Sequence, residues 1–268
     1  MITSTTNNKI KNASKLMSSA KLRREKNLFI AEGRKMFVEA CEYLIDNIEE
    51  VFISEKYAET LKGSLNEDLN KAVSEKLSTV NYEIVSDVVF KKLSDTVTPQ
   101  GVITIIKCPI YSFEKILKEM SGKDLKILVL EGIQDPGNLG TMVRTAEAAG
   151  VEFILADRNT VDIFNPKVIR STMGSVYRMP VIYTDNLIDD VNLLKTQDIK
   201  VYAAHLKGQN SYKEEAFYKR RAILIGNEGN GLSKEITEEA DILIKIPMKG
   251  KVESLNAAVA ASLLMFEE

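Results

Sequence analysis

The chain has 268 residues, enough for one large or two modest domains, and its apolar and charged fractions are 44% and 28%, as in ordinary globular proteins. No apolar run reaches the roughly 18 residues of a membrane span, and the polar start Met1-Ile-Thr-Ser-Thr-Thr is unlike a signal peptide. Two isolated cysteines, Cys41 and Cys108, and one histidine, His205, exclude a Cys-based redox motif and a His-rich metal site. We therefore expect a cytoplasmic protein that uses neither a membrane nor a metal.

The formal net charge of −2 hides an uneven distribution. Residues 1–35 hold nine lysines and arginines against two glutamates, a balance of +7, so the remainder carries −9. A basic arm on an acidic body suggests a polyanionic partner. The alternative is a solvated helix face without a ligand, and the sequence alone leaves both open.

The first part of the chain alternates helices and strands. We expect a basic helix over 7–27, strands at 28–31, 50–54, 82–85 and 102–107, and helices at 34–44, 55–62 and 87–93. A connection with one short helix at 113–120 follows. These patterns predict a first domain over 1–107 and a second over 120–268.

The second part begins with a continuous apolar strand, 126–130, typical of a buried parallel strand. We expect a helix over 139–149 capped by Asn138, and a helix over 165–173 that starts at Asn165-Pro166. Further strands are expected at 153–156, 181–183, 201–204, 222–225 and 242–246, and further helices at 188–195, after Ser233 and over 254–266. Alternating strands and helices predict a parallel sheet covered by helices on both faces.

Three loops combine glycine with Asn, Asp, Ser or Arg where predicted strands end. They are Asp135–Arg144, Gly226–Gly231 and Pro247–Asn256. Ligands of open α/β sheets bind outside the carboxyl ends of the strands, so these loops are the candidate site. The long side chain of Arg144 can lean back toward Asn138, because helical side chains point toward the helix N-terminus. Taken singly, Arg144 could instead pair with Glu147 or Glu131, and Asn138 could be a simple cap.

Other chemistries lack their motifs. The loop Gly226–Gly231 has no G-x-G-x-x-G spacing that opens a helix, and no G-x-x-x-x-G-K-[ST] motif occurs in the chain. The single histidine, His205, ends an apolar strand and is better explained as structural than as a catalytic base. A hydrolase based on a nucleophile–histidine pair is therefore disfavoured.

Together the loops resemble the three motifs of the SpoU (TrmH-like) RNA 2′-O-ribose methyltransferases. The first is Asp135-Pro-Gly-Asn-Leu-Gly with Arg144-Thr-Ala and Gly150, and the second is Leu224-Ile-Gly-Asn-Glu-Gly-Asn-Gly-Leu232. The third is Ile246-Pro-Met with Glu253-Ser-Leu-Asn-Ala-Ala-Val-Ala260. Asn165-Pro-Lys and Arg170-Ser-Thr-Met-Gly174 also match, with Thr172 where many members have Ser. Phe29-Ile-Ala-Glu-Gly33 and Thr98-Pro-Gln-Gly101 are similar to the family's L30e-like substrate-binding domain.

The resemblance implies a fold that periodicity does not reveal: a parallel α/β domain whose C-terminal segment forms a trefoil knot, after a smaller L30e-like α/β domain. It implies S-adenosylmethionine as cofactor, bound at Gly226, Ile246, Met248 and Leu255. It also implies a homodimer through the knot region, which fits the almost wholly apolar last helix.

The implied reaction is methylation of a ribose 2′-hydroxyl in structured RNA, and we expect the substrate to be 23S ribosomal RNA. Arg144 matches the family's essential arginine; we expect it to bind phosphate and orient the hydroxyl, since a guanidinium is a poor base. The other catalytic positions are Asn138, Glu228, Ser254 and Asn256, and the general base is unassigned. For RNA binding we expect Lys21, Arg23 and Arg24. The alternatives are a transfer RNA substrate, a non-catalytic RNA-binding paralogue, and a nucleotide-dependent α/β enzyme of another class.

Overall fold

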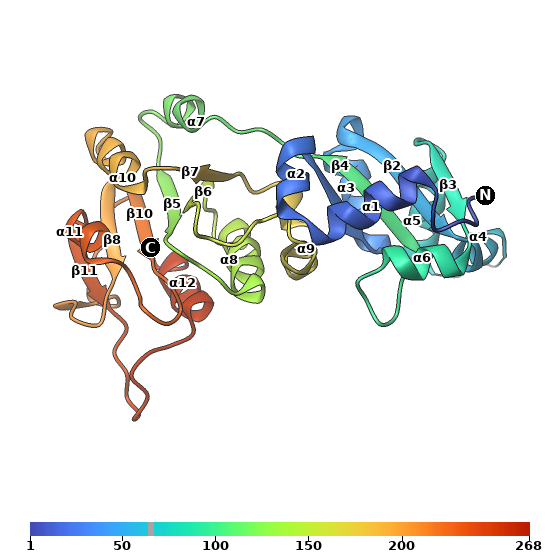
Figure 1. The fold of residues 1–268 in the computed structure, drawn as a ribbon. Helices are drawn as coiled ribbons and strands as arrows, with labels where there is room; N and C mark the ends of the chain where they lie inside the picture. The colour runs from blue at the N-terminus through green and yellow to red at the C-terminus, as the bar shows by residue number, and fades with distance from the viewer. Residues whose placement is uncertain (64–66) are drawn as a thin grey trace. The chain divides into compact units, whose positions relative to one another are not determined.

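The computed structural model describes residues 1–63 and 67–268 (Figure 1). The chain forms two compact units, Met1–Ile110 with Phe164–Tyr177, and Tyr111–Ile163 with Arg178–Glu268. Within the described ranges, no helix is long and apolar enough to cross a membrane. The sequence predicted one boundary between 107 and 120; it gave no sign that the chain returns to the first unit at Phe164–Tyr177.

The first unit has a four-stranded sheet in the order β1-β4-β2-β3. Its strand β4 is antiparallel to β1 and β2, whereas β2 and β3 are parallel. The strands are β1 (Leu28–Glu32), β2 (Ile48–Ser54), β3 (Tyr82–Val85) and β4 (Val102–Lys107). The helices of Met1–Ile110 are α1 (Asn8–Ser18), α2 (Ala20–Lys26), α3 (Arg34–Tyr43), α4 (Glu55–Lys62), α5 (Asp68–Leu77) and α6 (Asp87–Leu93), with the 3-10 turn η1 (Ile45–Asn47).

The predicted basic helix over 7–27 is wrong in one respect: it is two helices. Ser19 has extended backbone angles between α1 and α2, and its hydroxyl accepts the Leu22 N–H as the cap of α2. Arg23 is buried, only 3% exposed, and its guanidinium donates to the carbonyls of Leu16 and Met17 at the end of α1. The Ser19 cap and the hydrogen bonds of Arg23 therefore both stabilise the turn between α1 and α2.

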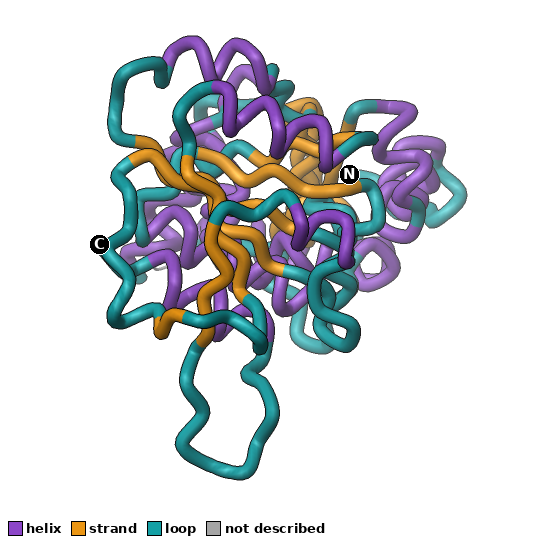
Figure 2. Tube along the Cα trace, turned by 90° about the vertical axis from the view of Figure 1, so that its left-hand side faces the viewer, coloured by secondary structure: helices purple, strands orange, loops and turns teal. Residues whose placement is uncertain are grey.

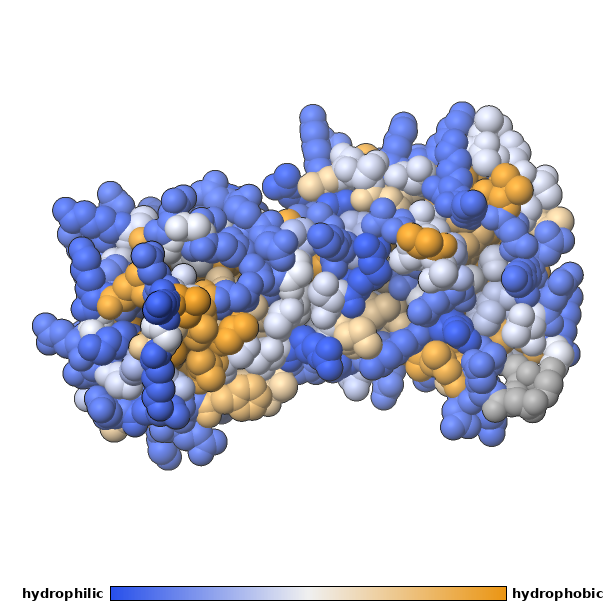
Figure 3. Space-filling view, turned by 90° about the horizontal axis from the view of Figure 1, so that it is seen from below, coloured by the Kyte–Doolittle hydropathy of each residue, from blue (hydrophilic) through white to orange (hydrophobic). Residues whose placement is uncertain are grey.

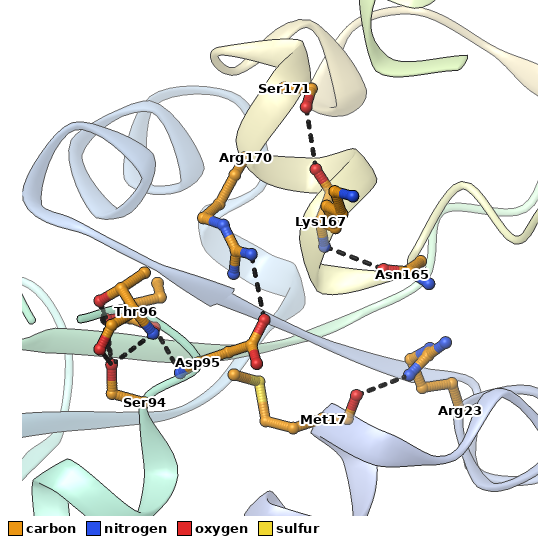
Figure 4. Close-up of polar contacts among 10 residues, drawn as sticks. Met17, Arg23, Ser94, Asp95, Thr96, Asn165, Lys167, Arg170 and Ser171 are labelled. Atoms are coloured by element: carbon orange, nitrogen blue, oxygen red, sulfur yellow. Dashed lines mark hydrogen bonds and ion pairs between the residues drawn. The ribbon is translucent and has the colours of Figure 1, made fainter. Parts of the chain in front are cut away.

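Segment Phe164–Tyr177 contains α9 (Pro166–Thr172) and η2 (Ser175–Tyr177), and it packs within the first unit. The Phe164 ring stacks on Phe29 of β1, with centroids 4.6 Å apart. Arg170 donates to Asp95 at 3.0 Å (Figure 4). The segment Ser94–Thr96 is itself fixed by the buried Glu32, which accepts from the Ser94 hydroxyl, the Thr96 hydroxyl and the Asp95 N–H.

The second unit has a seven-stranded sheet in the order β7-β6-β5-β10-β8-β11-β9, and every neighbouring pair is parallel. This confirms the predicted parallel sheet. The strands are β5 (Leu125–Leu130), β6 (Phe153–Asp157), β7 (Val181–Thr184), β8 (Lys200–Ala204), β9 (Asn210–Ser211), β10 (Arg220–Ile225) and β11 (Ile242–Lys245).

Helices cover this sheet on both faces. The core on one side joins side chains of α7 (Phe113–Glu119), α10 (Leu187–Thr196) and α11 (Lys234–Glu238) to the apolar strands. The helices α8 (Pro136–Ala148) and α12 (Ala257–Met265) pack against each other, and α12 also contacts β10. A long loop leaves the sheet after β11 and returns to α12 (Figure 2).

The two helices that follow the motif loops begin elsewhere than predicted. Asp135 caps α8, accepting the Asn138 N–H at 2.8 Å, and Pro136 occupies the first turn, so Asn138 lies inside the helix. The last helix starts at Ala257 rather than at Ser254, because Asn256 is its cap and accepts the N–H groups of Ala258 and Val259. The side chains of Asn138 and Ser254 are thus free of the capping role.

Candidate functional site

A cavity of about 360 Å³ lies at the carboxyl ends of three adjacent parallel strands, β8, β10 and β11. This volume lies within the range of small-molecule sites, roughly 300–1,000 Å³. All four positions expected to bind the cofactor line it: Gly226, Ile246, Met248 and Leu255. Sequence motifs from two distant loops therefore line one cavity.

Around the cavity, the backbones of neighbouring segments lie in direct contact at two glycines. A Cβ on Gly226 would lie 2.2 Å from the Gly231 carbonyl carbon and from the Leu232 nitrogen. A Cβ on Gly208 would lie 2.6 Å from the Ile244 carbonyl carbon. No side chain fits at either position, so glycine is required by the close approach rather than by a left-handed backbone.

A second, open hollow of about 560 Å³ adjoins this cavity, because both are lined by Glu228 and Ala257. Three of the expected catalytic residues line the hollow: Asn138, Glu228 and Asn256. The fourth, Ser254, lines the cavity. The arrangement offers an apolar pocket beside a polar opening that solvent can reach.

A chain of hydrogen bonds joins all three motif loops. Asn256 Nδ2 donates to Asn138 Oδ1 at 2.9 Å, and Asn138 Nδ2 donates to Glu228 Oε1 at 3.0 Å. The direction of the chain is fixed, because Asn256 Oδ1 already accepts backbone N–H groups as a helix cap. Only an ionised carboxylate at 228 can end such a chain as an acceptor on both oxygens.

Glu228 also holds the backbone of the first motif loop. Its Oε2 accepts the Gln134 N–H and its Oε1 the Asp135 N–H, both at 3.1 Å. Partial desolvation raises the pKa of Glu228, but the hydrogen bonds from Asn138 and from the two backbone N–H groups outweigh it and lower the pKa below its ordinary value. The carboxylate is thus a fixed anion that clamps the loops together.

Replacing Glu228 by glutamine is expected to lower the melting temperature at neutral pH by about 2–4 °C. The NH₂ group of the glutamine would then face the N–H of Gln134 or Asp135. Both groups are donors, so that hydrogen bond would be lost. The folded-state pKa lies below that of an unfolded glutamate, about 4.3. The stabilisation is therefore complete above that pH and is lost as the pH falls through the folded-state pKa.

Scanning calorimetry from pH 7 down to about pH 3 measures this difference, with Glu253→Gln as a control on an exposed loop carboxylate that has no hydrogen bond to the described residues. If the difference in melting temperature between wild type and Glu228→Gln stayed constant down to about pH 3, the ionised Glu228 carboxylate would not be what stabilises the loops.

Sequence reasoning missed several residues of the site. Asn227 Nδ2 donates to the Gly132 carbonyl, and its Oδ1 accepts the N–H groups of Gly229 and Asn230, so it shapes the tight turn after β10. His205 and Lys207 line the cavity after β8. Both residues follow the end of a strand, as ligand-binding residues often do. The sequence could not identify them, because it does not show that β8 lies between β10 and β11, the strands that precede the second and third motifs.

Arg144 lies on α8 six residues after Asn138, about 9 Å along the helix axis. It is exposed, lines neither cavity, and makes no ion pair or hydrogen bond within the described part of the chain. The two carboxylates that could have paired with Arg144 have other partners. Glu147 pairs with Arg178, and Glu131 accepts hydrogen bonds from Ser233. Its guanidinium is available to an external anion.

The three residues expected to bind RNA differ in placement. Lys21 and Arg24 are exposed on α2. Arg23 is buried and bonded to the end of α1, so this placement argues against a phosphate contact for Arg23.

The far end of α12 is also fixed. The Lys126 ammonium donates to the carbonyl oxygens of Ala149 and Met265, which end α8 and α12. Desolvation, and next the nearby Arg221, lower the pKa of Lys126. The two helices are therefore joined at one end by Asn138 and Asn256 and at the other by Lys126.

The cavity suits S-adenosylmethionine on structural grounds. Ile246, Met248 and Leu255 offer an apolar surface for an adenine ring, and the glycine turn presents backbone groups at close range. Among residues 1–63 and 67–268, no group of three or more His, Cys, Asp or Glu side chains could hold a metal ion.

Comparison with known proteins agrees with this chemistry. Residues 126–266 match the SpoU rRNA Methylase family, and residues 7–104 match the MRM3-like substrate binding domain. The Bacillus subtilis protein named 23S rRNA (guanosine(2553)-2′-O)-methyltransferase RlmP is 32% identical over 265 residues, which cover 99% of this chain and 97% of that protein.

Solved structures share the fold. An AdoMet-bound rRNA methyltransferase from Sinorhizobium meliloti is 30% identical, with a TM-score of 0.80 and coverage of 99% and 95%. The SpoU methyltransferase AviRb from Streptomyces viridochromogenes, in complex with AdoMet, superposes with a TM-score of 0.83 at 22% identity, which bears on the fold alone. The predicted enzyme class, its cofactor S-adenosylmethionine and the preceding substrate-binding domain are confirmed, and the chain belongs to the SpoU rRNA methylase family.

Proposed function

We propose that the protein methylates a ribose 2′-hydroxyl of 23S ribosomal RNA. The observation that carries this proposal is the junction of the apolar cavity with the polar hollow at Glu228 and Ala257. The full-length likeness to a 23S rRNA 2′-O-methyltransferase supports the substrate class.

S-adenosylmethionine, when bound, supplies a methyl group on a positively charged sulfur. The protein's task is then to hold the ribose oxygen in line with that methyl group and to exclude competing geometries. Ile246, Met248 and Leu255 hold the cofactor, and the Asn256–Asn138–Glu228 chain sets the loops around the hollow. We assign Ser254 a place beside the cofactor and Asn138 and Asn256 a place beside the ribose.

Arg144 binds the phosphate next to the target ribose. A planar guanidinium can hold two phosphate oxygens at once, and no described residue competes for it. The hydroxyl is then fixed through its own phosphate. The proton that it loses on methylation passes to water in the open hollow, and no side chain is assigned as its acceptor.

The alternatives make different products. A transfer RNA enzyme would methylate isolated transfer RNA, and a non-catalytic paralogue would bind RNA without transfer. Mapping 2′-O-methyl positions in the RNA of cells with and without the gene separates them. Loss of one methylated position in 23S RNA is expected; loss only in transfer RNA, or no loss at all, would overturn the proposal.

We further propose that the protein is a homodimer through α12. The positions Val259 and Phe266 are 48% and 58% exposed, although the helix is apolar almost all round. Val259, Leu263 and Phe266 follow the spacing of one helix stripe. Leu255, which the sequence placed on the same stripe, precedes the helix and lines the cavity. Figure 3 shows apolar side chains gathered on the second unit, on the side from which the long loop projects.

Sedimentation of the full chain is expected to give twice the monomer mass, and the double variant Val259→Glu with Phe266→Glu is expected to be monomeric. Leu193→Glu, on α10, is the matched control. The full chain is needed, because a fragment 120–268 would uncover Phe164, Val168 and Tyr177. A wild-type monomer at micromolar concentration refutes the dimer.

The basic arm is proposed to bind RNA through Lys21 and Arg24. Each phosphate contact contributes about 0.9 to the log–log salt slope on duplexes and about 0.7 on single strands. Lys21→Ala with Arg24→Ala is therefore expected to flatten the slope by roughly 1.4–1.8, without changing cofactor affinity. Lys62→Ala with Lys71→Ala is the matched control. An unchanged slope would mean that the arm is only a solvated face.

A trefoil knot formed by the C-terminal segment, and action in the cytoplasm, are part of the same proposal and rest on the family resemblance. An experimental structure that traces residues 246–268 without a break tests the knot. Fractionation of cells tests the location.

A further inference from the structure

The loop between β11 and α12 carries two lysines that serve neither the core nor the cavity. Lys249 and Lys251 flank Gly250 and are exposed. Neither forms an ion pair with a carboxylate of the described residues, whereas Lys195, Lys200 and Lys234 of the same unit do. Glu253 is the one acidic residue between Pro247 and Asn256.

Both ends of this loop belong to the site. Ile246 and Met248 line the cavity at one end, and Ser254 and Leu255 line it at the other. Asn256, which follows, lines the adjoining hollow and bonds to Asn138. The lysines therefore lie in the middle of a loop whose two ends line the cavity.

An RNA strand must approach a chain that carries −9 outside its first 35 residues. Cations close to the reacting ribose lower the repulsion that this charge imposes on phosphates. Arg144 on α8 is a candidate for such a cation, Lys207 after β8 is a second, and Lys249 and Lys251 are those that the loop between β11 and α12 supplies.

We propose that Lys249 and Lys251 contact the RNA backbone next to the target nucleotide, and that a filled cofactor cavity strengthens this contact. The cofactor orders the two ends of the loop, so the lysines lose less conformational freedom when they meet phosphates. By linkage, RNA must then raise cofactor affinity by the same factor. This inference rests on the proposed RNA substrate but concerns a surface distinct from the basic arm.

The test is RNA binding across a salt series, with deproteinised 23S RNA as the probe, with and without S-adenosylhomocysteine. Lys249→Ala with Lys251→Ala is expected to flatten the log–log slope by roughly 1.4–1.8 when the cavity is filled. In the wild type, S-adenosylhomocysteine is expected to raise RNA affinity. In the double variant this increase is expected to be absent. Affinity for S-adenosylhomocysteine without RNA is expected to stay unchanged.

Lys115→Ala with Lys118→Ala, on α7, removes the same charge from exposed positions that line neither cavity, and is expected to keep both the slope and the gain. An unchanged slope in the loop variant, an equal change with and without S-adenosylhomocysteine, or a loss of the dimer in sedimentation would overturn the inference. Methyl transfer by the wild type separates the two hypotheses, since its absence would refute the proposed function rather than the role of the loop.

Discussion

Replacing Arg144 by alanine is expected to slow methyl transfer by at least about 100-fold, the size of effect that small errors in positioning produce. Affinity for S-adenosylhomocysteine is expected to stay nearly unchanged, because Arg144 does not line the cofactor cavity. Single-turnover transfer to 23S RNA measures the first quantity and calorimetry the second. The loss is expected in the chemical step, since the role proposed for the guanidinium is to orient the ribose.

Arg144→Lys is expected to recover little of this loss, because an ammonium cannot reproduce the two parallel hydrogen bonds of a guanidinium. Arg158→Ala is the matched control, an exposed arginine of the same unit that pairs with Asp185. Near-normal turnover of Arg144→Ala would show that the assigned role is wrong.

Gly226→Ala is expected to weaken cofactor binding by roughly 10- to 100-fold. The new Cβ would lie 2.2 Å from backbone atoms of Gly231 and Leu232, so the turn must move away from the cavity that it lines. Overpacking of this kind costs about 1–3 kcal/mol, and 1.4 kcal/mol corresponds to a factor of ten in affinity. Calorimetric titration with S-adenosylhomocysteine measures the change.

Gly229→Ala provides a control within the same turn. The nearest atom to its Cβ is Asn227 Oδ1 at 3.6 Å, an ordinary contact, so near-normal affinity is expected. If Gly226→Ala bound the cofactor as tightly as Gly229→Ala, close backbone packing at Gly226 would not be what shapes the cavity.

The second unit could be predicted well from the sequence because its signals are local. Apolar runs such as 126–130 mark buried parallel strands, and the three motif loops follow strand ends. The starts of helices were less accurate. Asp135, Asn138, Ser254 and Asn256 are all good caps by residue type. The sequence does not show that the Asn138 side chain instead bonds with Asn256 and Glu228.

Contacts between distant segments could not be predicted. Nothing local in Pro166–Thr172 indicates that α9 packs on β1 within the first unit, because the stack of Phe164 on Phe29 joins residues far apart in the chain. Arg23 looked like its neighbours Lys21 and Arg24 in a basic run. Its burial depends on the break at Ser19, which turns its guanidinium toward the end of α1.

The protein is expected to transfer the methyl group to a ribose oxygen of ribosomal RNA. The test incubates purified protein with deproteinised 23S RNA and S-adenosylmethionine labelled in its methyl group, and then hydrolyses the RNA with alkali. Alkali cleaves RNA through the free 2′-hydroxyl, so a 2′-O-methylated nucleotide survives within an alkali-resistant dinucleotide. We expect the label in such dinucleotides. Label released in mononucleotides would place the methyl group on a base and contradict methylation of the ribose.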